Sequence, residues 1–379
     1  MTPRRPRYRT GSDELDQKID DLLDAAGATD NRDQLFEILV SGVALAGDDV
    51  DRLDLKIANA ALQEMRGAYN MFAPYRDVPK ATIFGSARTL PDDPLYGHTR
   101  ELAAGLAKRG WMVVTGAGPG IMEAGMEGAG REQAIGVLIR LPFEGGANDI
   151  IAGDPKLIEM KYFFTRKLML MKESAAFVAL PGGFGTLDET FELLTLVQTG
   201  KAVPVPIVLL DVPGRTYWQG MRDFVEDEVL DNRMISPPDI RLYKITDSID
   251  EALAEIDDFY RNYHSIRFVG DRLVVRLRAT PTDEELAALN EEFADIVAEG
   301  AIERTEALAA EVRGDDHVDL PRLVLRFDKR SWGRFRMLID RLNTLDSAPA
   351  ETGAKPPTVA EDAAVAARSD DAEPDDEQL

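Results

Sequence analysis

The chain has 379 residues, 44% of them hydrophobic, which allows two domains, or one domain with large additions, around a sizeable core. Its formal net charge of −24 argues against general nucleic-acid binding, and no apolar run approaches the roughly 18 residues of a membrane-spanning helix. The absence of cysteine excludes disulfide bonds and thiol catalysis and agrees with a cytoplasmic protein, while three scattered histidines argue against a histidine-rich metal site.

The first 74 residues are expected to be helical after a short disordered start. Residues 1–11 are basic, but no apolar core follows them, so they are predicted to be disordered and not a secretory signal. Helical spacing predicts three helices, at 12–22, 32–45 and 49–69. Ser12 can cap the first of them. The helical segment 12–74 is expected to pack as ordinary core or to form a cap or an oligomer surface.

An α/β body is predicted over residues 75–264, where short apolar runs alternate with helical stretches. The predicted strands are 81–84, 111–114, 134–141, 177–180, 205–210 and 242–246. The predicted helices include 95–109, 156–173, 217–229 and 248–263. This alternation implies a doubly wound, Rossmann-like parallel sheet, whose ligands bind beyond the carboxyl ends of the strands. The loops after Phe84, Val114 and Leu180 should converge there.

The pattern changes beyond residue 264. The predicted elements are strands at 272–278 and 321–327 and helices at 284–298 and 331–345. They indicate a small α+β addition over 265–346, with packing as its default role and an oligomer contact or an effector site as alternatives. From Asp346 onward, ten acidic and two basic residues give a net charge of −8, and residues 347–379 are predicted to be disordered.

The clearest chemical signal follows the apolar run 177–180. Residues 181–186 read PGGFGT, a glycine-rich loop between a buried strand and a helix start. Glycine lets the backbone approach a ligand closely, and a helix start offers unpaired N–H groups and a positive dipole end, which suit phosphate. The same residues also allow a purely structural reading, in which Thr186 and Glu189 form a capping box. The residues alone leave both readings open.

Two further features point to the same edge of the sheet. Gly116, Gly118 and Gly120 have the spacing G-x-G-x-G, which is not the dinucleotide fingerprint, and there is no G-x-x-x-x-G-K-[ST] phosphate loop. Two separated glycine turns suit a mononucleotide better than NAD or ATP. Arg166 and Lys167 are adjacent in the sequence, and such a pair of positive side chains is usually solvated on the protein surface. Their helix is otherwise rich in apolar residues, so at least one of them should point into a cleft.

Four motifs resemble those of the LOG ("lonely guy") family, phosphoribohydrolases that activate cytokinins and that often carry the older label lysine decarboxylase-like. PGGFGTLDE matches the family signature PGGxGTxxE, and MKYFFTRKLMLM at 160–171 resembles its arginine–lysine segment. IFGSAR at 83–88 and TGAGPGIMEAG at 115–125 resemble its first turn and its second glycine loop. The resemblance covers about residues 75 to 260. The LPFE at 141–144 and the long ends suggest the larger bacterial branch.

LOG-type enzymes hydrolyse the N-glycosidic bond of a nucleoside 5′-monophosphate to free base and ribose 5-phosphate. Carried over by motif, the resemblance implies Arg166 and Glu189 as catalytic residues. The implied substrate contacts are Gly85, Ser86, Gly118, Glu144, Lys167, Gly182, Gly183, Gly185, Thr186 and Thr195. Glu189 would stabilise positive charge on the ribose or orient water, and Arg166 would orient Glu189 or assist departure of the base. The resemblance implies a small nucleotide substrate and a homodimer or higher homo-oligomer. No metal, cofactor, nucleic-acid partner or membrane is expected.

Other interpretations stay open beside this one. A nucleotide-binding regulator could use the same loops without cleavage, although Arg166 and Glu189 together weigh against an inactive enzyme. Carriers of cofactors or nucleic acid have related folds, but the acidity of the chain argues against DNA. A lysine decarboxylase would need pyridoxal phosphate, and no lysine stands in a recognisable Schiff-base context. The sequence does not identify the base, which could be adenine, an isopentenylated adenine or another base.

Overall fold

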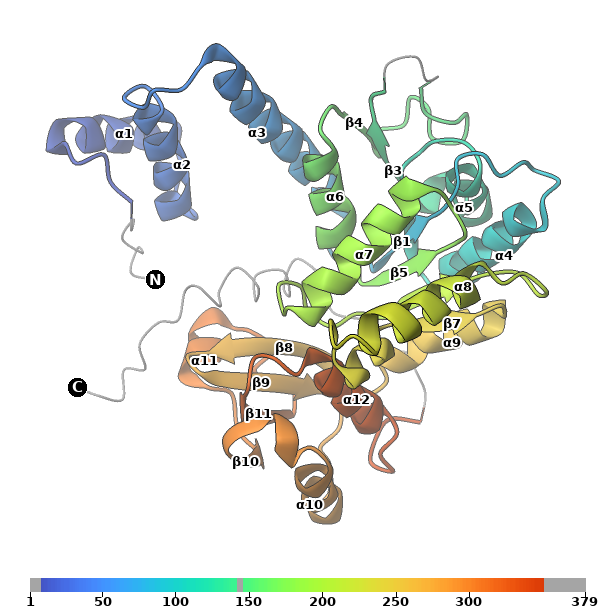
Figure 1. The fold of residues 1–379 in the computed structure, drawn as a ribbon. Coiled ribbons are helices and arrows are strands. Elements are labelled where there is room, and N and C mark those ends of the chain that lie inside the picture. Colours follow the sequence, from blue (N-terminus) through green and yellow to red (C-terminus); the bar gives the residue numbers. More distant parts are fainter. Residues whose placement is uncertain (1–7, 142–145, 351–379) are drawn as a thin grey trace. The chain divides into compact units, whose positions relative to one another are not determined.

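The computed structural model describes residues 8–141 and 146–350 of the chain (Figure 1). The chain divides into two compact units, Met1–Gln63 and Glu64–Leu379. The disorder predicted for 1–11 and 347–379 concerns mostly residues outside the described part. Among the described residues, no helix is long and apolar enough to span a bilayer.

The first unit is helical. It contains α1 (Asp13–Ala25), α2 (Arg32–Ala44) and the first part of α3 (Arg52–Phe72). Ser12 accepts a hydrogen bond from the backbone N–H of Leu15, which confirms the predicted cap of α1. The small apolar core of this unit is formed by Ile19, Leu23, Phe36 and Val40.

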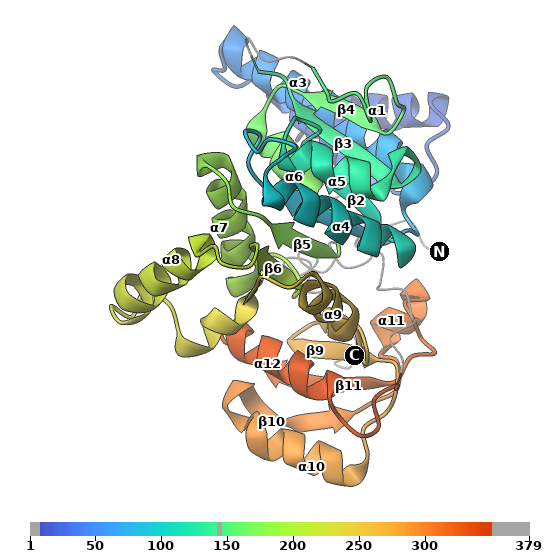
Figure 2. The same ribbon diagram turned by 90° about the vertical axis from the view of Figure 1, so that its right-hand side faces the viewer.

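A seven-stranded parallel sheet forms the centre of the second unit, in the order β4-β3-β2-β1-β5-β6-β7 (Figure 2). Its strands are β1 (Lys80–Phe84), β2 (Met112–Thr115), β3 (Ala134–Ile139), β4 (Leu157–Met160), β5 (Ala176–Ala179), β6 (Ile207–Leu210) and β7 (Lys244–Thr246). Its helices are α4 (Pro94–Lys108), α5 (Ile121–Ala129), α6 (Phe163–Lys172), α7 (Phe184–Gln198), α8 (Tyr217–Phe224) and α9 (Ile249–Phe259). The chain runs outward from β1 to β4 and then returns to β5 on the other side of β1. The predicted doubly wound α/β fold is confirmed, and the chain order reverses between β1 and β5.

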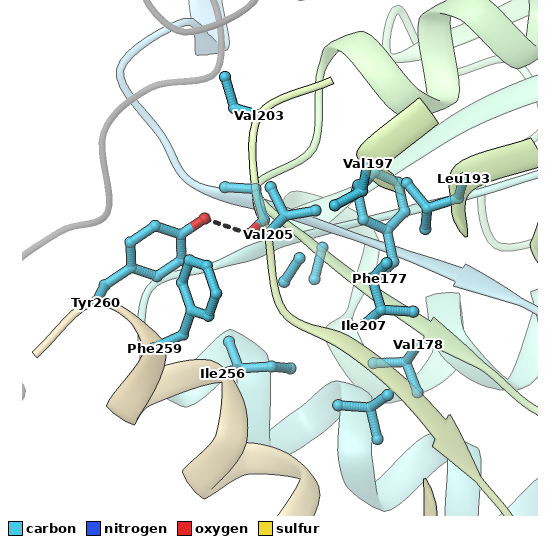
Figure 3. Close-up of a cluster of buried hydrophobic side chains, with 14 of the residues drawn as sticks. Phe177, Val178, Leu193, Val197, Val203, Val205, Ile207, Ile256, Phe259 and Tyr260 are labelled. Carbon is cyan, nitrogen blue, oxygen red and sulfur yellow. Dashed lines mark hydrogen bonds between the residues drawn. The ribbon is translucent and has the colours of Figure 1, made fainter. Parts of the chain in front are cut away.

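The core of the sheet is apolar on both faces, as expected for buried parallel strands. Around β5 and β6, α7 contributes Leu193 and Val197, and α9 contributes Ile256 and Phe259 (Figure 3). The hydroxyl of Tyr260, directly after α9, donates to the carbonyl of Ala175 at 2.8 Å. This bond satisfies a polar group that would otherwise be costly to bury.

One predicted helix of the α/β body is wrong in part. Residues 156–173 were expected to be a single helix, but 157–160 form the edge strand β4, and α6 begins only at Phe163. Leu157, Ile158 and Met160 fit helical spacing as well as they fit a short strand at the edge of a sheet. The pairing of β4 with β3, which is a long-range contact, decides between the two.

The C-terminal addition has more strands than predicted. Its antiparallel sheet has the order β10-β11-β9-β8. The elements are β8 (Tyr263–Val269), β9 (Arg272–Leu277), α10 (Asp283–Glu292), β10 (Val297–Arg304), α11 (Ala309–Gly314), β11 (Arg322–Phe327) and α12 (Trp332–Asn343). The predicted β-α-β-α pattern missed β8 and β10. In β8, His264 and Ser265 are both buried, which removes the alternation typical of a half-exposed strand. In β10, Gly300 has a φ of +79°, and the pairing with β11 is irregular.

The addition packs against the end of α7. Gly200, just beyond that helix, has a φ of +69°, and a Cβ there would lie 2.3 Å from the ring of Trp332 on α12. Glycine is therefore required at this position both by conformation and by contact. The helix that carries Glu189 is thus held by the addition at its C-terminal end.

Candidate functional site

Three loops meet at the carboxyl ends of β1, β2 and β5. The backbone N–H of Ser86 donates to the carbonyl of Pro181 at 3.3 Å, and the carbonyl of Ser86 accepts from the N–H of Ile121 at 3.0 Å. The loop after β1 is therefore bonded to the loop after β5 on one side and to the start of α5 on the other. The predicted convergence of these loops is confirmed.

Some glycines of these loops are explained by packing. A Cβ on Gly85 would lie 2.4 Å from the side chain of Ile121, and a Cβ on Gly120 would lie 2.4 Å from the carbonyl oxygen of Ser86. A Cβ on Gly182 would lie 2.2 Å from Oγ1 of Thr186. At these three positions any other residue would push the loops apart. These three glycines therefore let the loops pack closely whether or not a ligand binds.

Gly183 and Gly185 have no such explanation. An added Cβ at either residue would meet no atom within 4 Å, and neither has a positive φ. Gly185 lies in the first turn of α7, where glycine costs roughly 0.5–1 kcal/mol relative to alanine. Both are exposed, as is Phe184 between them. Open backbone at a helix start is suited to an approaching anion.

The capping-box reading of the loop is wrong. The N-cap of α7 is Gly183, and the N–H of Thr186 is bonded to the Gly183 carbonyl at 3.1 Å. Thr186 therefore lies inside the first turn of the helix, and Glu189 lies in the second turn. Neither side chain is needed to close the helix start, so the buried Glu189 carboxyl requires another explanation.

Arg166 and Glu189 face each other from neighbouring helices. Nη1 of Arg166 lies 3.9 Å from Oε1 of Glu189, and the two side chains are 13% and 7% exposed. Nε of Arg166 donates to the carbonyl of Val137 at 3.0 Å, which fixes the guanidinium against β3. A Cβ on Gly116 would lie 2.1 Å from Nη2 of Arg166. The second glycine loop thus leaves the space that the guanidinium fills.

The carboxyl of Glu189 is poised near neutral pH. Burial raises its pKa to about 7, and the nearby charges of Arg166 and Lys167 act in the opposite direction. Its Oε2 is buried and has no hydrogen-bond partner among the residues that the structure describes. A carboxyl with such a pKa can exchange a proton at physiological pH. The unsatisfied oxygen is available to a group that the chain itself does not supply.

Lys167 is engaged with α7. Its Nζ lies 2.8 Å from Oδ2 of Asp188 and 2.5 Å from Oε2 of Glu192, and its side chain is 12% exposed. Burial would lower the pKa of this lysine, but the hydrogen bonds to Asp188 and Glu192 raise it overall. Lys167 therefore stays charged and ties α6 to α7. A substrate contact by this residue would need an exchange of partners.

The remaining predicted substrate contacts are placed unevenly. Ser86, Gly85, Gly118, Gly182 and Thr186 lie in or beside the converging loops. Thr195 is exposed on α7 and donates to the carbonyl of Phe191 at 2.7 Å. Six residues separate it from Glu189, which places it on a different face of the helix. Glu144 lies outside the described residues. The roles of all these residues stay predictions.

Two residues that support the loops were not predicted from the sequence. The hydroxyl of Tyr217, on α8, donates to the carbonyl of Gly182 at 2.7 Å. Nδ2 of Asn148 donates to the carbonyls of Ala117 and Gly118 at 3.1 and 3.0 Å, and Ala117 has a φ of +58°. These contacts join residues 30 to 35 positions apart in the chain. No local pattern could have indicated them.

In the described part of the chain, no group of three His, Cys, Asp or Glu side chains could hold a metal ion. The chemistry available at the loops is that of a carboxyl near neutral pH, a buried guanidinium and open backbone N–H groups. These are the groups expected where an anion binds and positive charge develops nearby.

Comparison with known proteins identifies the family. The family described as "Possible lysine decarboxylase" matches residues 109–256. A cytokinin riboside 5′-monophosphate phosphoribohydrolase of Mycobacterium tuberculosis is 31% identical over 156 residues, which cover 40% of this chain and 80% of that protein. A protein of the same name from Arabidopsis thaliana is 27% identical over 188 residues, covering 48% of this chain and 85% of that protein.

Solved structures are also similar over part of the chain. The molybdenum cofactor carrier protein of Chlamydomonas reinhardtii is 24% identical and has a TM-score of 0.32, covering 47% of this chain and 94% of its own. The family itself is shown by the mycobacterial relative, four-fifths of which is matched at 31% identity. The chain therefore belongs to the LOG family.

Proposed function

We propose that this protein hydrolyses the N-glycosidic bond of a nucleoside 5′-monophosphate, either AMP or a cytokinin riboside 5′-monophosphate, to free base and ribose 5-phosphate. The observation that carries the proposal is the buried pair of Arg166 and Glu189 beside an open, glycine-lined helix start. The names of the mycobacterial and Arabidopsis relatives support the same reaction. Membership of the family supports a hydrolase.

In the proposed mechanism the 5′-phosphate binds at the start of α7, against the backbone of Gly183 and Gly185. Glu189 lies in the second turn of the same helix, and we propose that the ribose extends toward it. As the bond between C1′ and the base nitrogen breaks, positive charge develops on the ribose, and the Glu189 carboxylate stabilises it. Water then forms the new bond to C1′ and gives a proton to Glu189. The departing base takes up one proton from solvent, and Glu189 returns its proton to solvent, so the carboxylate is restored.

Arg166 has a supporting part in this mechanism. Its charge lowers the pKa of Glu189 and keeps more of the carboxyl ionised than burial alone would allow. Its guanidinium could also stabilise the departing base. The phosphate supplies binding energy that is used at the sugar carbon, away from the phosphate itself.

The proposal is tested by incubating the protein with a panel of nucleoside 5′-monophosphates and measuring the released base by chromatography. We expect base and ribose 5-phosphate from AMP or a cytokinin nucleotide. Adenosine should be turned over with a kcat/KM at least about 100-fold lower, because it lacks the phosphate. Equal turnover of AMP and adenosine would contradict the proposed use of the helix start. Nucleotides that raise the melting temperature without any base release would favour the regulator instead.

Gly185→Ala should separate ligand binding from folding. We expect the variant to be as stable as the natural chain or up to about 1 kcal/mol more stable, because alanine favours a helix. The affinity for AMP should fall at least about tenfold, since the methyl group would occupy the space proposed for the phosphate. Urea unfolding and calorimetric titration measure the two effects.

Gly182→Ala is the control for that experiment. Its Cβ would lie 2.2 Å from Oγ1 of Thr186 and 3.0 Å from the backbone nitrogen of Ser86. It should therefore lose stability. If Gly185→Ala lost stability as well and bound AMP normally, the open glycines would be structural and the phosphate site would lie elsewhere.

We also propose that the protein is a homodimer or a higher homo-oligomer. Large apolar side chains are exposed on two adjacent helices, at Phe163, Phe164, Leu168, Phe184 and Phe191. The bonds of Lys167 to Asp188 and Glu192 show that these helices, α6 and α7, lie side by side. An exposed apolar surface of this kind is typical of an interface. A single-chain mass in sedimentation experiments would contradict an oligomer.

A further inference from the structure

The start of α6 is held by a side chain from a distant part of the sequence. Oε1 of Glu64, on α3, accepts the backbone N–H of Lys161 at 2.8 Å. Oε2 of the same carboxylate accepts the hydroxyl of Thr165 at 2.6 Å and the N–H of Tyr162 at 3.4 Å. These donors span the turn between β4 and α6 and the first turn of the helix. One carboxylate, 97 positions away from Lys161, therefore fastens this turn.

The helix has no cap of its own. Tyr162 occupies the N-cap position, and its side chain makes no capping hydrogen bond. A helix start carries unpaired N–H groups and a positive dipole end, and both favour a nearby carboxylate. Glu64 supplies this carboxylate from α3. It is half-buried, so its interactions are less screened than those of a surface ion pair.

The bond to Thr165 sets the rotation of the first turn. Thr165 is fully buried and directly precedes Arg166 in the sequence. Consecutive residues of an α-helix point about 100° apart, so fixing Thr165 toward α3 also fixes the direction of Arg166. That direction leads to the Val137 carbonyl and to the Glu189 carboxyl. A slip of this turn would move the guanidinium away from both.

The helix that carries Glu64 is itself closely packed there. A Cβ on Gly67, one turn further along α3, would lie 3.1 Å from Cδ1 of Ile158 on β4. Glycine thus lets α3 approach β4 closely. Because the approach is close, the Glu64 carboxylate reaches the backbone of the β4–α6 turn without an intervening residue. The packing of α3 against β4 therefore fixes the position from which the Glu64 carboxylate reaches this turn.

We propose that Glu64 is a positioning residue of the hydrolase, which holds the first turn of α6 so that Arg166 stays opposite Glu189. The inference rests on the proposed function. It gives the helix that precedes the α/β body a part in catalysis, whereas its sequence predicts only packing or an oligomer surface. Glu64 itself touches neither Glu189 nor the open glycines, and it acts through Arg166.

Kinetics of the full-length chain test this role. We expect Glu64→Ala to lower kcat for base release about tenfold or more, because small displacements of a catalytic group are costly, while KM changes less than about threefold. Glu64→Gln keeps an acceptor oxygen but loses the charge, so its kcat should lie between those of the natural chain and Glu64→Ala. Tyr69→Ala is the control: its ring lies under Nζ of Lys172 at 5.6 Å, at the far end of α6, and kcat should stay within about twofold.

A double-mutant cycle separates positioning from general stability. In an Arg166→Ala background, Glu64→Ala should reduce kcat by less than about twofold, since the group that Glu64 positions is already gone.

The pH midpoint of kcat gives a second readout. The charged groups around Glu189 are Arg166, Lys167, Asp188 and Glu192. Glu64→Ala releases the turn of α6 that carries both positive groups, Arg166 and Lys167, so the acid limb of kcat should move to higher pH.

Equal losses from Glu64→Ala in both backgrounds would overturn the proposal. So would an unchanged kcat and pH midpoint with only a lower melting temperature. If Glu64→Ala does not fold, Glu64→Gln and Thr165→Val carry the same test. If the natural chain releases no base from any nucleotide, the proposed function fails separately. In that case the positioning role is tested by the distance from Arg166 to Glu189 in a crystal structure of Glu64→Gln. If this distance is the same as in the natural chain, Glu64 does not position Arg166.

Discussion

Glu189→Gln is expected to lower kcat for base release by about 10³-fold or more while the chain stays folded. Glutamine has nearly the same shape but cannot ionise, so it can neither stabilise a positive ribose nor accept a proton from water. The capping-box reading predicted a loss of folding instead, but the Glu189 side chain lies in the second turn of α7 and closes no helix start. Circular dichroism and base release on the same preparation measure both properties.

The same substitution should change how stability depends on pH. Burial raises the pKa of Glu189 from 4.5 to about 7. Between these two values the unfolded chain has lost the proton that the folded chain keeps, so this residue makes stability fall as pH rises. Above about pH 7 the cost is at most about 3 kcal/mol, and Glu189→Gln should remove it. The variant should therefore unfold at higher temperature than the natural chain at pH 8 but not at pH 4.

Glu127→Gln is a suitable control for these measurements. Glu127 lies on α5, where it pairs with Arg100 at 2.9 Å on the surface and accepts the hydroxyl of Tyr96 at 3.1 Å, a bond that glutamine can still accept. The same chemical change there should leave kcat within about twofold, because exposed pairs contribute little. If Glu189→Gln retained most of the natural kcat, Glu189 would be neither the base nor the charge-stabilising group. The proposed mechanism would then be wrong even if base release itself occurred.

The parallel sheet could be predicted because its signals are local. Strands such as β2 and β5 are buried on both faces and appear as short apolar runs, and the order of strands and helices limits the topology. The meeting of the loops at the carboxyl ends follows from that topology. The strands β4, β8 and β10 were missed because their patterns depend on partners far away in the sequence. His264 in β8 is buried beside Ser265 and bonded to it, which no alternation of apolar residues reveals.

The candidate site also has a part that could be predicted from local sequence and a part that depends on distant contacts. The motif around Gly183 and Glu189 is contiguous and could be recognised. The contacts of Glu64 with α6, of Tyr217 with Gly182 and of Asn148 with Ala117 are not contiguous, and they appear only when the chain is folded. The difference has a physical origin: a ligand site needs groups at fixed local spacing, whereas support for those groups can come from any element that packs nearby.

Arg166→Ala should reduce kcat about 100-fold and move the acid limb of the pH profile upward. The guanidinium favours the ionised form of Glu189, so in the natural chain the limb should lie near pH 7. Without that charge, burial is opposed mainly by Lys167, so the pKa of Glu189 rises further. At neutral pH a larger fraction of the carboxyl is then protonated and inactive. Rates of base release from about pH 5 to pH 9 measure the midpoint and the plateau together.

Arg166→Lys distinguishes charge from geometry in the same experiment. The ammonium group keeps the positive charge, but a lysine offers no planar guanidinium that can donate to the Val137 carbonyl while facing Glu189. We therefore expect its pH midpoint to return toward that of the natural chain while its plateau stays low. Recovery of both would mean that charge alone matters. A natural midpoint and plateau in Arg166→Ala would remove Arg166 from the mechanism, and with it the reason for Glu64 to hold the start of α6.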